Sequence, residues 1–299
     1  MQKYLKYLIN IFIFISFVIA QVTESMVEFS LGEHNALQMN LIDVDKKLVE
    51  DEWKQYTKSF GNPDKKKGEF ITKGVNLEGL TNPIDWYLSL DKNKKDILFQ
   101  LCIISNEEFL SSTNQNDNYK IIENYLKNFV FVVDRAKVNE IFEAEKETLA
   151  KLQKELKKLS KDHDSNLKST EKYAKKIKDT EKDNKSTLKK QAEIKKDISK
   201  QGIIVEEILS NPSDSIKEGE VSDEYEEANK KLLKLQKKLE KLGDDYEDNL
   251  KSIEKSIKKI ENRKKDNKSI LKDQTKTKKQ ITEQGQVVEN IRKQLELMR

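Results

Sequence analysis

The segment KLQKELKKLS at residues 151–160 recurs as KLQKKLEKLG at residues 234–243, and these two stretches decide the architecture of the chain. They open two longer copies, 151–209 and 234–292, which are identical at 33 of 59 positions at an offset of 83 residues. Such self-similarity at a fixed offset indicates an internal duplication. We therefore expect the second half of the chain to contain two equivalent structural elements.

The first copy carries a line of residues spaced alternately three and four apart, which is the heptad spacing of a coiled coil. The positions on this line are Leu149, Leu152, Leu156, Leu159, His163, Asn166, Thr170, Tyr173, Ile177, Thr180, Asn184, Thr187, Gln191, Ile194, Ile198, Gln201, Val205 and Ile208. Polar residues alternate with apolar ones along the line and weaken the helix pairing. We therefore expect the coil to be stable only through its length.

A break separates the two copies, because Pro212 and Gly219 interrupt the helical pattern. We expect one helix over 134–210, a loop over 211–222 and a second helix over 223–299. Two long helices joined by a short loop favour an antiparallel hairpin.

Four asparagines give a predicted register for this hairpin. A fold-back at the centre of the loop sets Asn166 opposite Asn267, and Asn184 opposite Asn249, in the buried layers. Buried asparagine pairs commonly fix the register of a coiled coil at some cost in stability. The same pairing sets Thr170 opposite Arg263, which is a poor layer. A parallel homodimer, in which each asparagine meets its own copy, is the alternative arrangement.

Composition excludes a single compact enzyme core. Of the 299 residues, 37% are charged and 35% hydrophobic, whereas ordinary domains have about 25% and 45–50%. Disorder is not expected either, because the chain has only 3 Pro and 9 Gly and is rich in Lys, Glu, Leu and Ile, as long helices are. Residues 21–134 have a net charge of −6 and residues 135–299 a net charge of +8. Acids recur among these lysines, so we expect mixed helix surfaces and no binding of nucleic acid.

The first twenty residues, MQKYLKYLINIFIFISFVIA, have the pattern of an export signal. Lys3 and Lys6 precede an apolar run, and the small residue Ala20 predicts cleavage before Gln21. The run is shorter than the roughly 20 residues of a membrane-spanning helix, although a retained signal anchor is the alternative. No second apolar span follows, so we expect no transmembrane span after signal removal. The predicted location is the periplasm or cell envelope, or the medium.

Residues 21–133 contain most of the aromatic side chains and predict a small α+β domain. Alternating apolar residues predict strands over Val27–Leu31, 37–41, 70–75, 84–88 and 97–104, the last of them central. A helix that carries Trp53 is expected after a cap at Asp43 or Asp45, and another from Asn116 or Asp117 to 133. The run VFVV at 130–133 is the alternative, a strand. The order of elements implies an antiparallel sheet with helices on one face.

Candidate catalytic groups are scarce. Cys102 is the single cysteine, which excludes an intramolecular disulfide, and we expect it to be buried in a strand. His34 is expected in a surface turn between two strands, far in sequence from His163. No phosphate loop, metal-ligand motif or nucleophile motif occurs. The sequence therefore predicts no catalytic, cofactor-binding or metal-binding residue, no cofactor and no enzyme activity.

Several features together resemble a group of uncharacterised exported proteins of Gram-negative bacteria. The resemblance lies in NALQMNL at 35–41, the tryptophan-bearing helix that follows, FLSS at 109–112 and the unbroken passage into the coil. It covers the mature chain and implies a TBP-like α+β domain followed by a long lysine- and glutamate-rich coil. It implies no activity and no site residues.

Two functional hypotheses follow. In the first, the chain is a structural or interaction protein whose coiled coil is a spacer or binds a protein partner or another copy. In the second, the α+β domain binds a small apolar ligand, and the coil is an accessory. Trp86 and Tyr87, which point to opposite faces of one predicted strand, are the weak indication for the second.

Overall fold

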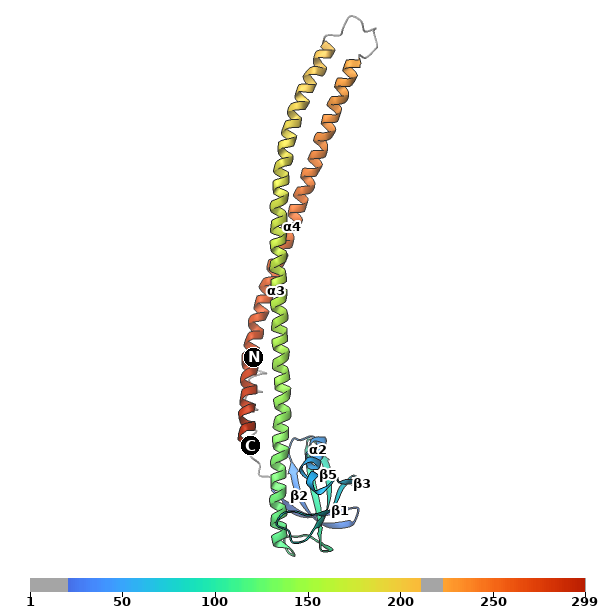
Figure 1. Ribbon diagram of the computed structural model, residues 1–299, viewed down its shortest axis with the longest axis vertical. Helices are drawn as coiled ribbons and strands as arrows, with labels where there is room; N and C mark the ends of the chain where they lie inside the picture. Colours follow the sequence, from blue (N-terminus) through green and yellow to red (C-terminus); the bar gives the residue numbers. More distant parts are fainter. Residues whose placement is uncertain (1–20, 211–222, 299) are drawn as a thin grey trace. The chain divides into compact units, whose positions relative to one another are not determined.

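The computed structural model describes residues 21–210 and 223–298 (Figure 1). The predicted signal 1–20, including Ala20 of the predicted cleavage site, lies outside the described residues, which begin at Gln21. The predicted loop 211–222 also lies outside them.

The described residues form two compact units, and we treat each by itself. The sheet unit contains the residues up to Lys151 together with those from Thr282 onward. The hairpin unit contains the residues from Leu152 to Ile281. The C-terminal end of the chain therefore belongs to the same compact unit as the sheet.

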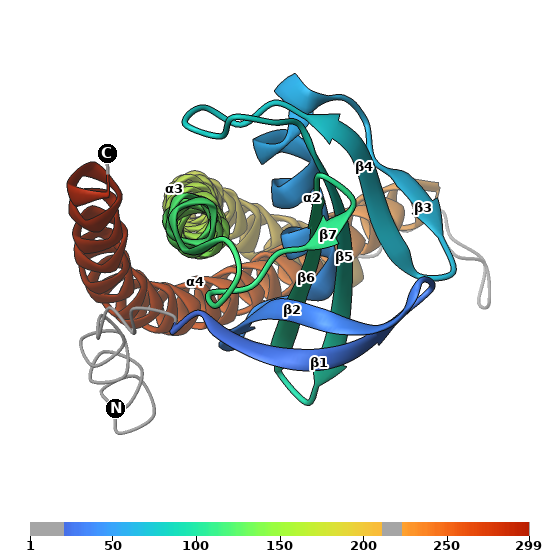
Figure 2. The same ribbon diagram turned by 90° about the horizontal axis from the view of Figure 1, so that it is seen from below.

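An antiparallel sheet of seven strands, counted over the described residues, forms the centre of the sheet unit (Figure 2). The strands are β1 (Thr23–Phe29), β2 (Gly32–Leu41), β3 (Asp64–Lys66), β4 (Glu69–Val75), β5 (Ile84–Asn93), β6 (Asp96–Ser105) and β7 (Glu108–Phe109). Neighbouring strands follow the order β1-β2-β6-β5-β4-β3, and β7 pairs with β6. β6 thus has neighbours on both sides, which confirms the prediction of a central strand.

The first β-hairpin turns earlier than the sequence analysis predicts. Phe29 pairs with Gly32, so Ser30 and Leu31 form the turn and His34 lies within β2. Gly32 has a φ of +110°, a value that side chains disfavour, and it lets the chain re-enter the sheet after two residues. The predictions that Leu31 lies in a strand and His34 in a turn are therefore wrong.

A short helix, α2 (Lys46–Tyr56), follows β2 and begins where the sequence predicts. The Asp45 carboxylate accepts a hydrogen bond from the backbone N–H of Lys47 at 2.8 Å and caps the helix. A single 3₁₀ turn, η1 (Lys58–Phe60), continues the chain to Gly61, whose φ of +106° ends it.

Two long helices make up the rest of the described chain, α3 (Asn116–Ser210) and α4 (Asp223–Leu297). The β-like run at 130–133 is helical, and Val130 and Val133 of this run are buried against the sheet. The predicted boundary between 133 and 134 falls inside α3, so the globular part and the long helix share one element.

Aromatic side chains fill the space between the sheet and the helices of the sheet unit. The Trp53 ring of α2 lies 5.3 Å from that of Trp86, 5.1 Å from that of Phe99 and 5.0 Å from that of Phe129, between ring centroids. Only strand residues, among them Tyr87 and Cys102, cluster on the opposite face of the sheet. The sheet therefore carries its helices on one face, as the sequence predicts.

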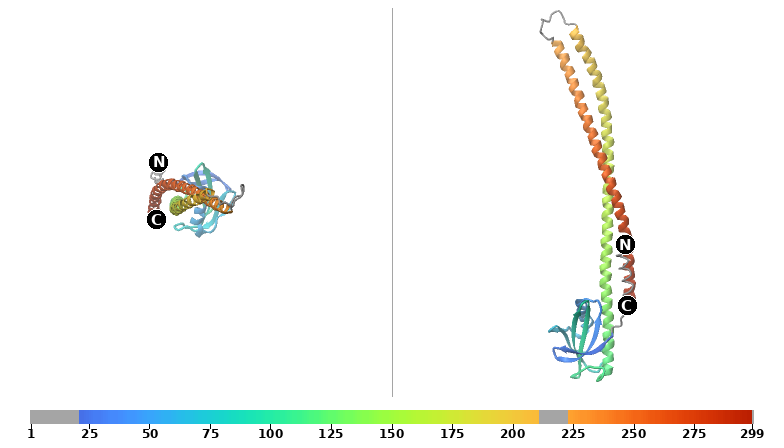
Figure 3. Two further views of the ribbon diagram at one scale, coloured as in Figure 1. Left: turned by 90° about the horizontal axis from the view of Figure 1, so that it is seen from above. Right: turned by 180° about the vertical axis from the view of Figure 1, so that it is seen from behind.

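In the hairpin unit, α3 and α4 run antiparallel, side by side (Figure 3). The Arg263 guanidinium donates to the Asn166 amide oxygen at 2.9 Å, and the Gln201 amide donates to the backbone oxygen of Ala228 at 3.2 Å. In both bonds the two residue numbers add to 429, so one register holds along the unit. The helical hairpin that the sequence predicts is present.

The ends of the same two helices meet inside the sheet unit. There the Gln284 amide donates to the backbone oxygen of Glu145 at 3.1 Å, and these two numbers also add to 429. Ile291 and Met298, near the end of α4, are buried.

Candidate functional site

The predicted heptad line of α3 is its least exposed face. Every one of the predicted positions from Leu149 to Ile208 is buried or half-buried, whereas all residues between them are exposed except Ser169 and Gly202. In α4 the same spacing of half-buried and buried positions runs from Tyr225 to Met298, interrupted only at the exposed Arg263. We call these two lines the core stripe. Its 3.5-residue spacing is what a helix needs to keep one face against a partner helix over many turns.

The four predicted register asparagines all lie on the core stripe. Asn166, Asn184 and Asn267 are buried and Asn249 is half-buried. The amide oxygen of Asn166 accepts its hydrogen bond from Arg263, which lies one turn before the predicted partner Asn267.

Two of these asparagines are incompletely bonded. The amide oxygens of Asn184 and Asn267 are buried and have no hydrogen-bond partner. A buried polar atom left unpaired costs about 1–3 kcal/mol, so these two layers weaken the hairpin. The bonds across the hairpin join residues whose numbers add to 429, whereas the predicted pairs Asn166–Asn267 and Asn184–Asn249 add to 433. A long side chain such as Arg263 can bond one turn away from its own layer, so these bonds do not test the asparagine pairing, which stays a prediction.

Lysines occupy the outermost line of α3. This lysine row recurs at every seventh position, opposite the core stripe, and all of its members are exposed: Lys154, Lys161, Lys168, Lys175, Lys182, Lys189 and Lys196. None of them makes an ion pair with any residue of 21–210 or 223–298. The acids of α3 lie on neighbouring lines, Asp164 among them, so the helix as a whole has the expected mixed surface while this one line is uniformly basic.

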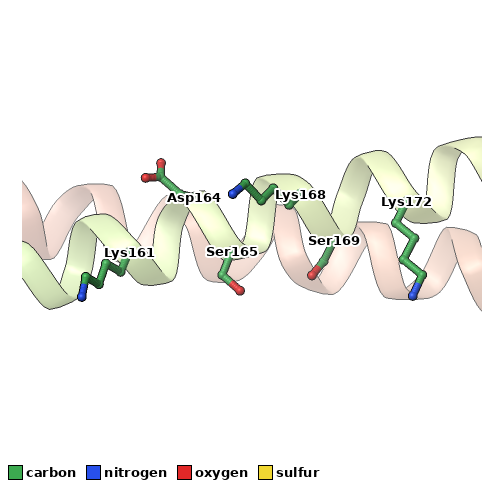
Figure 4. A pocket seen from close by; sticks show the side chains of 6 residues that line it. All are labelled: Lys161, Asp164, Ser165, Lys168, Ser169 and Lys172. Carbon is green, nitrogen blue, oxygen red and sulfur yellow. The ribbon is translucent and has the colours of Figure 1, made fainter.

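A shallow groove follows the lysine row over three turns of α3 (Figure 4). Its lining residues are Lys161, Asp164, Ser165, Lys168, Ser169 and Lys172. All six come from one helix, and Figure 4 shows their side chains diverging rather than meeting at one point. The groove has ammonium groups for an anion but no enclosing wall, which is unlike the concave sites that hold small molecules.

The sheet unit keeps its candidate reactive groups out of solvent. Cys102 is fully buried in β6, and burial, with a smaller contribution from Glu69, raises its pKa to about 12. The group is therefore a neutral thiol at physiological pH, and the prediction of a buried strand cysteine is confirmed. His34 stacks on Phe109 with ring centroids 3.6 Å apart, and its Nε2 lies 3.0 Å from the backbone oxygen of Leu31.

Trp86 and Tyr87 point to opposite faces of β5, as predicted. Trp86 belongs to the core beneath the helices, and Tyr87 to the cluster on the other face. Burial raises the pKa of Tyr125, which packs in the same aromatic core as Trp86. Side chains thus occupy the space in which the second hypothesis places an apolar ligand.

The described residues hold neither a metal-binding cluster nor a membrane-spanning helix. No group of three or more His, Cys, Asp or Glu side chains could hold a metal ion within 21–210 and 223–298. Within the same ranges, no helix has both the length and the apolar character to cross a membrane.

Sequence reasoning missed two features of the hairpin surface. One is the lysine row, and the other is a line of exposed apolar residues at a single heptad position. Both have a seven-residue period that would show in the sequence if each heptad position were compared separately. Comparison with known proteins adds nothing to these geometric findings, because no protein-family model matches the chain and no curated protein is significantly similar to it.

Proposed function

We propose that this chain is an exported, non-enzymatic interaction protein in which α3 and α4 form an antiparallel coiled coil. The coiled coil acts as a spacer or as the element on which a protein partner docks, and the sheet unit is a separate compact unit of the same molecule.

The observation that carries the proposal is the core stripe. A 3.5-residue spacing that persists through both helices is the signature of coiled-coil packing, and every predicted position of α3 follows it. The cross-helix hydrogen bonds Asn166–Arg263 and Gln201–Ala228 support an intramolecular pairing. They favour the hairpin over the parallel homodimer, in which these residues would lie far apart.

The alternative function, an apolar-ligand site in the sheet unit, has weaker support. Trp53, Trp86, Phe99 and Phe129 pack on one another with none of their surface exposed. Aromatic rings at centroid distances of 5–6 Å are in direct contact. An apolar ligand would have to displace part of this core. The coiled coil as a spacer or docking element is therefore the preferred function.

The coiled coil is tested by a distance between spin labels at Lys175→Cys and Lys258→Cys. Both residues are exposed and make no described ion pair, and the buried Cys102 leaves no competing thiol. A coiled-coil hairpin predicts a separation of about 25 Å, the width of two helices with their labels. In one continuous helix the 83 residue steps between them would separate the labels by about 125 Å. A long distance in protein diluted with unlabelled chain would contradict the proposal.

The docking role is tested by photo-crosslinking in the cell that produces the protein. A photoreactive amino acid at Lys175 samples the rod, and one at the exposed Lys73 samples β4 of the sheet unit. We expect protein adducts from Lys175 and fewer from Lys73. Adducts from Lys73 alone would favour the sheet unit as the binding element, and none at either position would contradict an interaction role.

A further inference from the structure

One flank of the hairpin unit carries large exposed apolar side chains, directly after residues of the core stripe. They are Leu167 and Leu188 from α3, and Leu250, Ile257 and Leu271 from α4, with exposed fractions between 44% and 48%. All five occupy the same heptad position. Each directly follows a core-stripe residue whose next stripe residue is four positions further along, as Leu167 follows Asn166, with Thr170 next on the stripe. Five side chains of this size at one heptad position form a pattern rather than scattered surface leucines.

The five side chains lie on the same side of the hairpin. An antiparallel helix pair has an approximate two-fold axis perpendicular to the plane of its two helices. Rotation about this axis exchanges the helices without turning the pair over, so the same heptad position of both helices lies on the same face of the hairpin. Leu167 and its opposite residue Lys264 directly follow Asn166 and Arg263, which are hydrogen-bonded across the helices. Because the helices run antiparallel, the step from each bonded residue leads in opposite directions, so Leu167 and Lys264 are offset by about 3 Å along the axis. The bond therefore places residues of this heptad position whose numbers add to 431 at nearly the same level.

At each of five successive levels, one of the two helices supplies a large apolar side chain. The pairs across the hairpin are Ser160 with Leu271, Leu167 with Lys264, Ala174 with Ile257, Glu181 with Leu250 and Leu188 with Gly243. We call this line the apolar seam. It runs from residue 160 to residue 188 of α3, which is about 42 Å at 1.5 Å per residue.

The opposite flank provides an internal comparison, because it carries no apolar residue over the same stretch. Its residues are Asp162, Ser169, Lys176, Asp183 and Lys190 on α3, and Lys238, Asp245, Ser252, Lys259, Asp266 and Asp273 on α4. A helix with apolar residues at the two core positions and at one flanking position is typical of bundles of more than two helices, whereas a strict two-helix coil needs only the core positions.

We propose that the apolar seam docks against the apolar seam of a second copy of this chain, so that two hairpins form a four-helix bundle in the hairpin unit. The proposal rests on the proposed coiled coil and adds a partner and a surface to it. The seam is about 42 Å long and two helices are about 20 Å wide, so each copy would contribute roughly 800 Å², the size of a standard specific interface.

Steric fit favours a second copy as the occupant. When two seams face each other in parallel about a two-fold axis along their length, α3 of one copy lies over α4 of the other. Leu271 then faces Ser160, Ile257 faces Ala174 and Leu188 faces Gly243 of the other copy. Large side chains thus meet small ones at three of the five levels, which is how helices of a bundle interdigitate.

Charge on the outer borders of the seam also fits a second copy. In the same arrangement, opposite charges meet at three levels and like charges at one. The opposite pairs are Lys178 with Glu254, Lys185 with Glu247, and Asp164 with Lys268, and the like pair is Glu171 with Glu261. Within one hairpin these residues lie on opposite outer borders, so the complementarity has a use only between copies.

The test compares two double variants of the full chain at equivalent positions of the two sequence copies. The seam variant is Leu167→Glu with Leu250→Glu, and the matched control is Ser169→Glu with Ser252→Glu on the opposite flank. Both add two negative charges, the seam variant at exposed positions and the control at half-buried ones from which a glutamate can reach solvent, so neither should unfold the chain. Mass is measured by light scattering and sedimentation, and helix content by far-ultraviolet circular dichroism.

We expect twice the chain mass for the unchanged protein and for the control, and one chain mass for the seam variant at the same helix content. A single chain mass for the unchanged protein at about 100 µM, which corresponds to a Kd weaker than 100 µM, would overturn the proposal. A seam variant that stays dimeric would also overturn it. If the glutamates reduce helix content, the Leu167→Gln with Leu250→Gln variant replaces them.

The spin-label distance between positions 175 and 258, repeated in the seam variant, separates the two levels of inference. A short distance in a monomeric seam variant means that the coiled coil forms and the seam joins the copies. A long distance in every variant means that the coiled coil itself is absent, which is the failure of the proposed function.

Discussion

The sheet unit and the hairpin unit differ in what they bury. In the sheet unit, Trp53, Phe99 and Phe129 are fully enclosed by other apolar side chains. In the hairpin unit, most core-stripe residues are only half-buried, and its buried positions include the polar residues Asn166, Ser256 and Thr277. The first unit thus owes its stability to apolar burial, whereas the second sums many weak layers over a long helix pair.

The largest contrast is expected in thiol chemistry. Cys102 has its pKa raised to about 12 by burial, from an ordinary value of 9.0, which lowers its thiolate fraction at neutral pH about a thousandfold. A cysteine introduced at Lys175 is exposed. We expect an aromatic disulfide reagent at pH 7.5 to label position 175 at least a thousandfold faster than Cys102. Fast labelling of Cys102 in the native protein would show that the sheet unit opens readily.

The raised pKa of Cys102 also determines how the stability of the sheet unit changes with pH. Because the folded state holds the proton more tightly than the unfolded state, the stabilisation from the neutral thiol is complete below pH 9 and is lost as the pH rises towards 12. We therefore expect alkaline unfolding of the sheet unit before that of the hairpin unit, whose described residues contain no cysteine. Replacing Cys102 by Ala should remove part of this alkaline sensitivity, as followed by tryptophan fluorescence against pH.

Removing the central ring of the sheet core is the next largest change. Trp53→Ala deletes a fully buried ring that contacts Trp86, Phe99 and Phe129, and such truncations cost about 3–5 kcal/mol. We expect the near-ultraviolet circular dichroism of the sheet unit to collapse while most far-ultraviolet helix signal remains. Met26→Ala, at a residue that is 59% exposed, is the control. Loss of all helix signal with Trp53→Ala would mean that the two units unfold as one.

The sequence predicts the two units to different depths. In the hairpin unit, one heptad line gives every buried residue of α3 and all of its half-buried residues except Ser169 and Gly202, because an isolated helix pair has only one buried direction. In the sheet unit, alternation gives the long strands, but β3 and β7, with three and two residues, are too short to show a period.

The misplaced His34 has a related cause. Alternation predicts which residues share a face but not where a two-residue turn begins, and here Gly32 sets that point. The surface of the hairpin also escaped the sequence analysis, since the lysine row and the apolar seam depend on charge and apolarity at positions outside the core stripe. A count of acids and bases over a whole segment gives only its net charge and does not show that one side of a helix is uniformly basic.

Substitution of a buried polar residue in the hairpin should raise the stability, whereas truncation of a ring in the sheet core lowers it. Asn184 is buried, and its amide oxygen has no hydrogen-bond partner, so Asn184→Leu is expected to raise the stability of the hairpin unit by about 1–3 kcal/mol. Asn166→Leu is the matched comparison, because it removes the acceptor of the Arg263 guanidinium and should give less or no gain. Thermal unfolding followed at 222 nm measures both. An equal gain from the two variants would show that the Asn166–Arg263 bond contributes nothing.

The smallest expected effect concerns the lysine row. At three and four residues from Lys182, the spacings that share a helix face, lie two lysines, Lys178 and Lys185, and one acid, Asp179. Lys182→Glu replaces net repulsion with attraction and should stabilise the hairpin unit by a few tenths of a kcal/mol, the size of exposed helix pairs.

Lys175 offers the matched control for this reversal. Its neighbours at three and four residues, Glu171, Lys172, Lys178 and Asp179, balance in charge, so Lys175→Glu should change stability by less than Lys182→Glu. Urea unfolding at low salt resolves the difference, which should disappear at about 1 M salt, where the Debye length falls to 3 Å. If Lys182→Glu instead lowers the stability more than Lys175→Glu does, the outermost line of α3 already faces an anionic group. The exposed side of the hairpin would then contribute to stability as well as its core stripe.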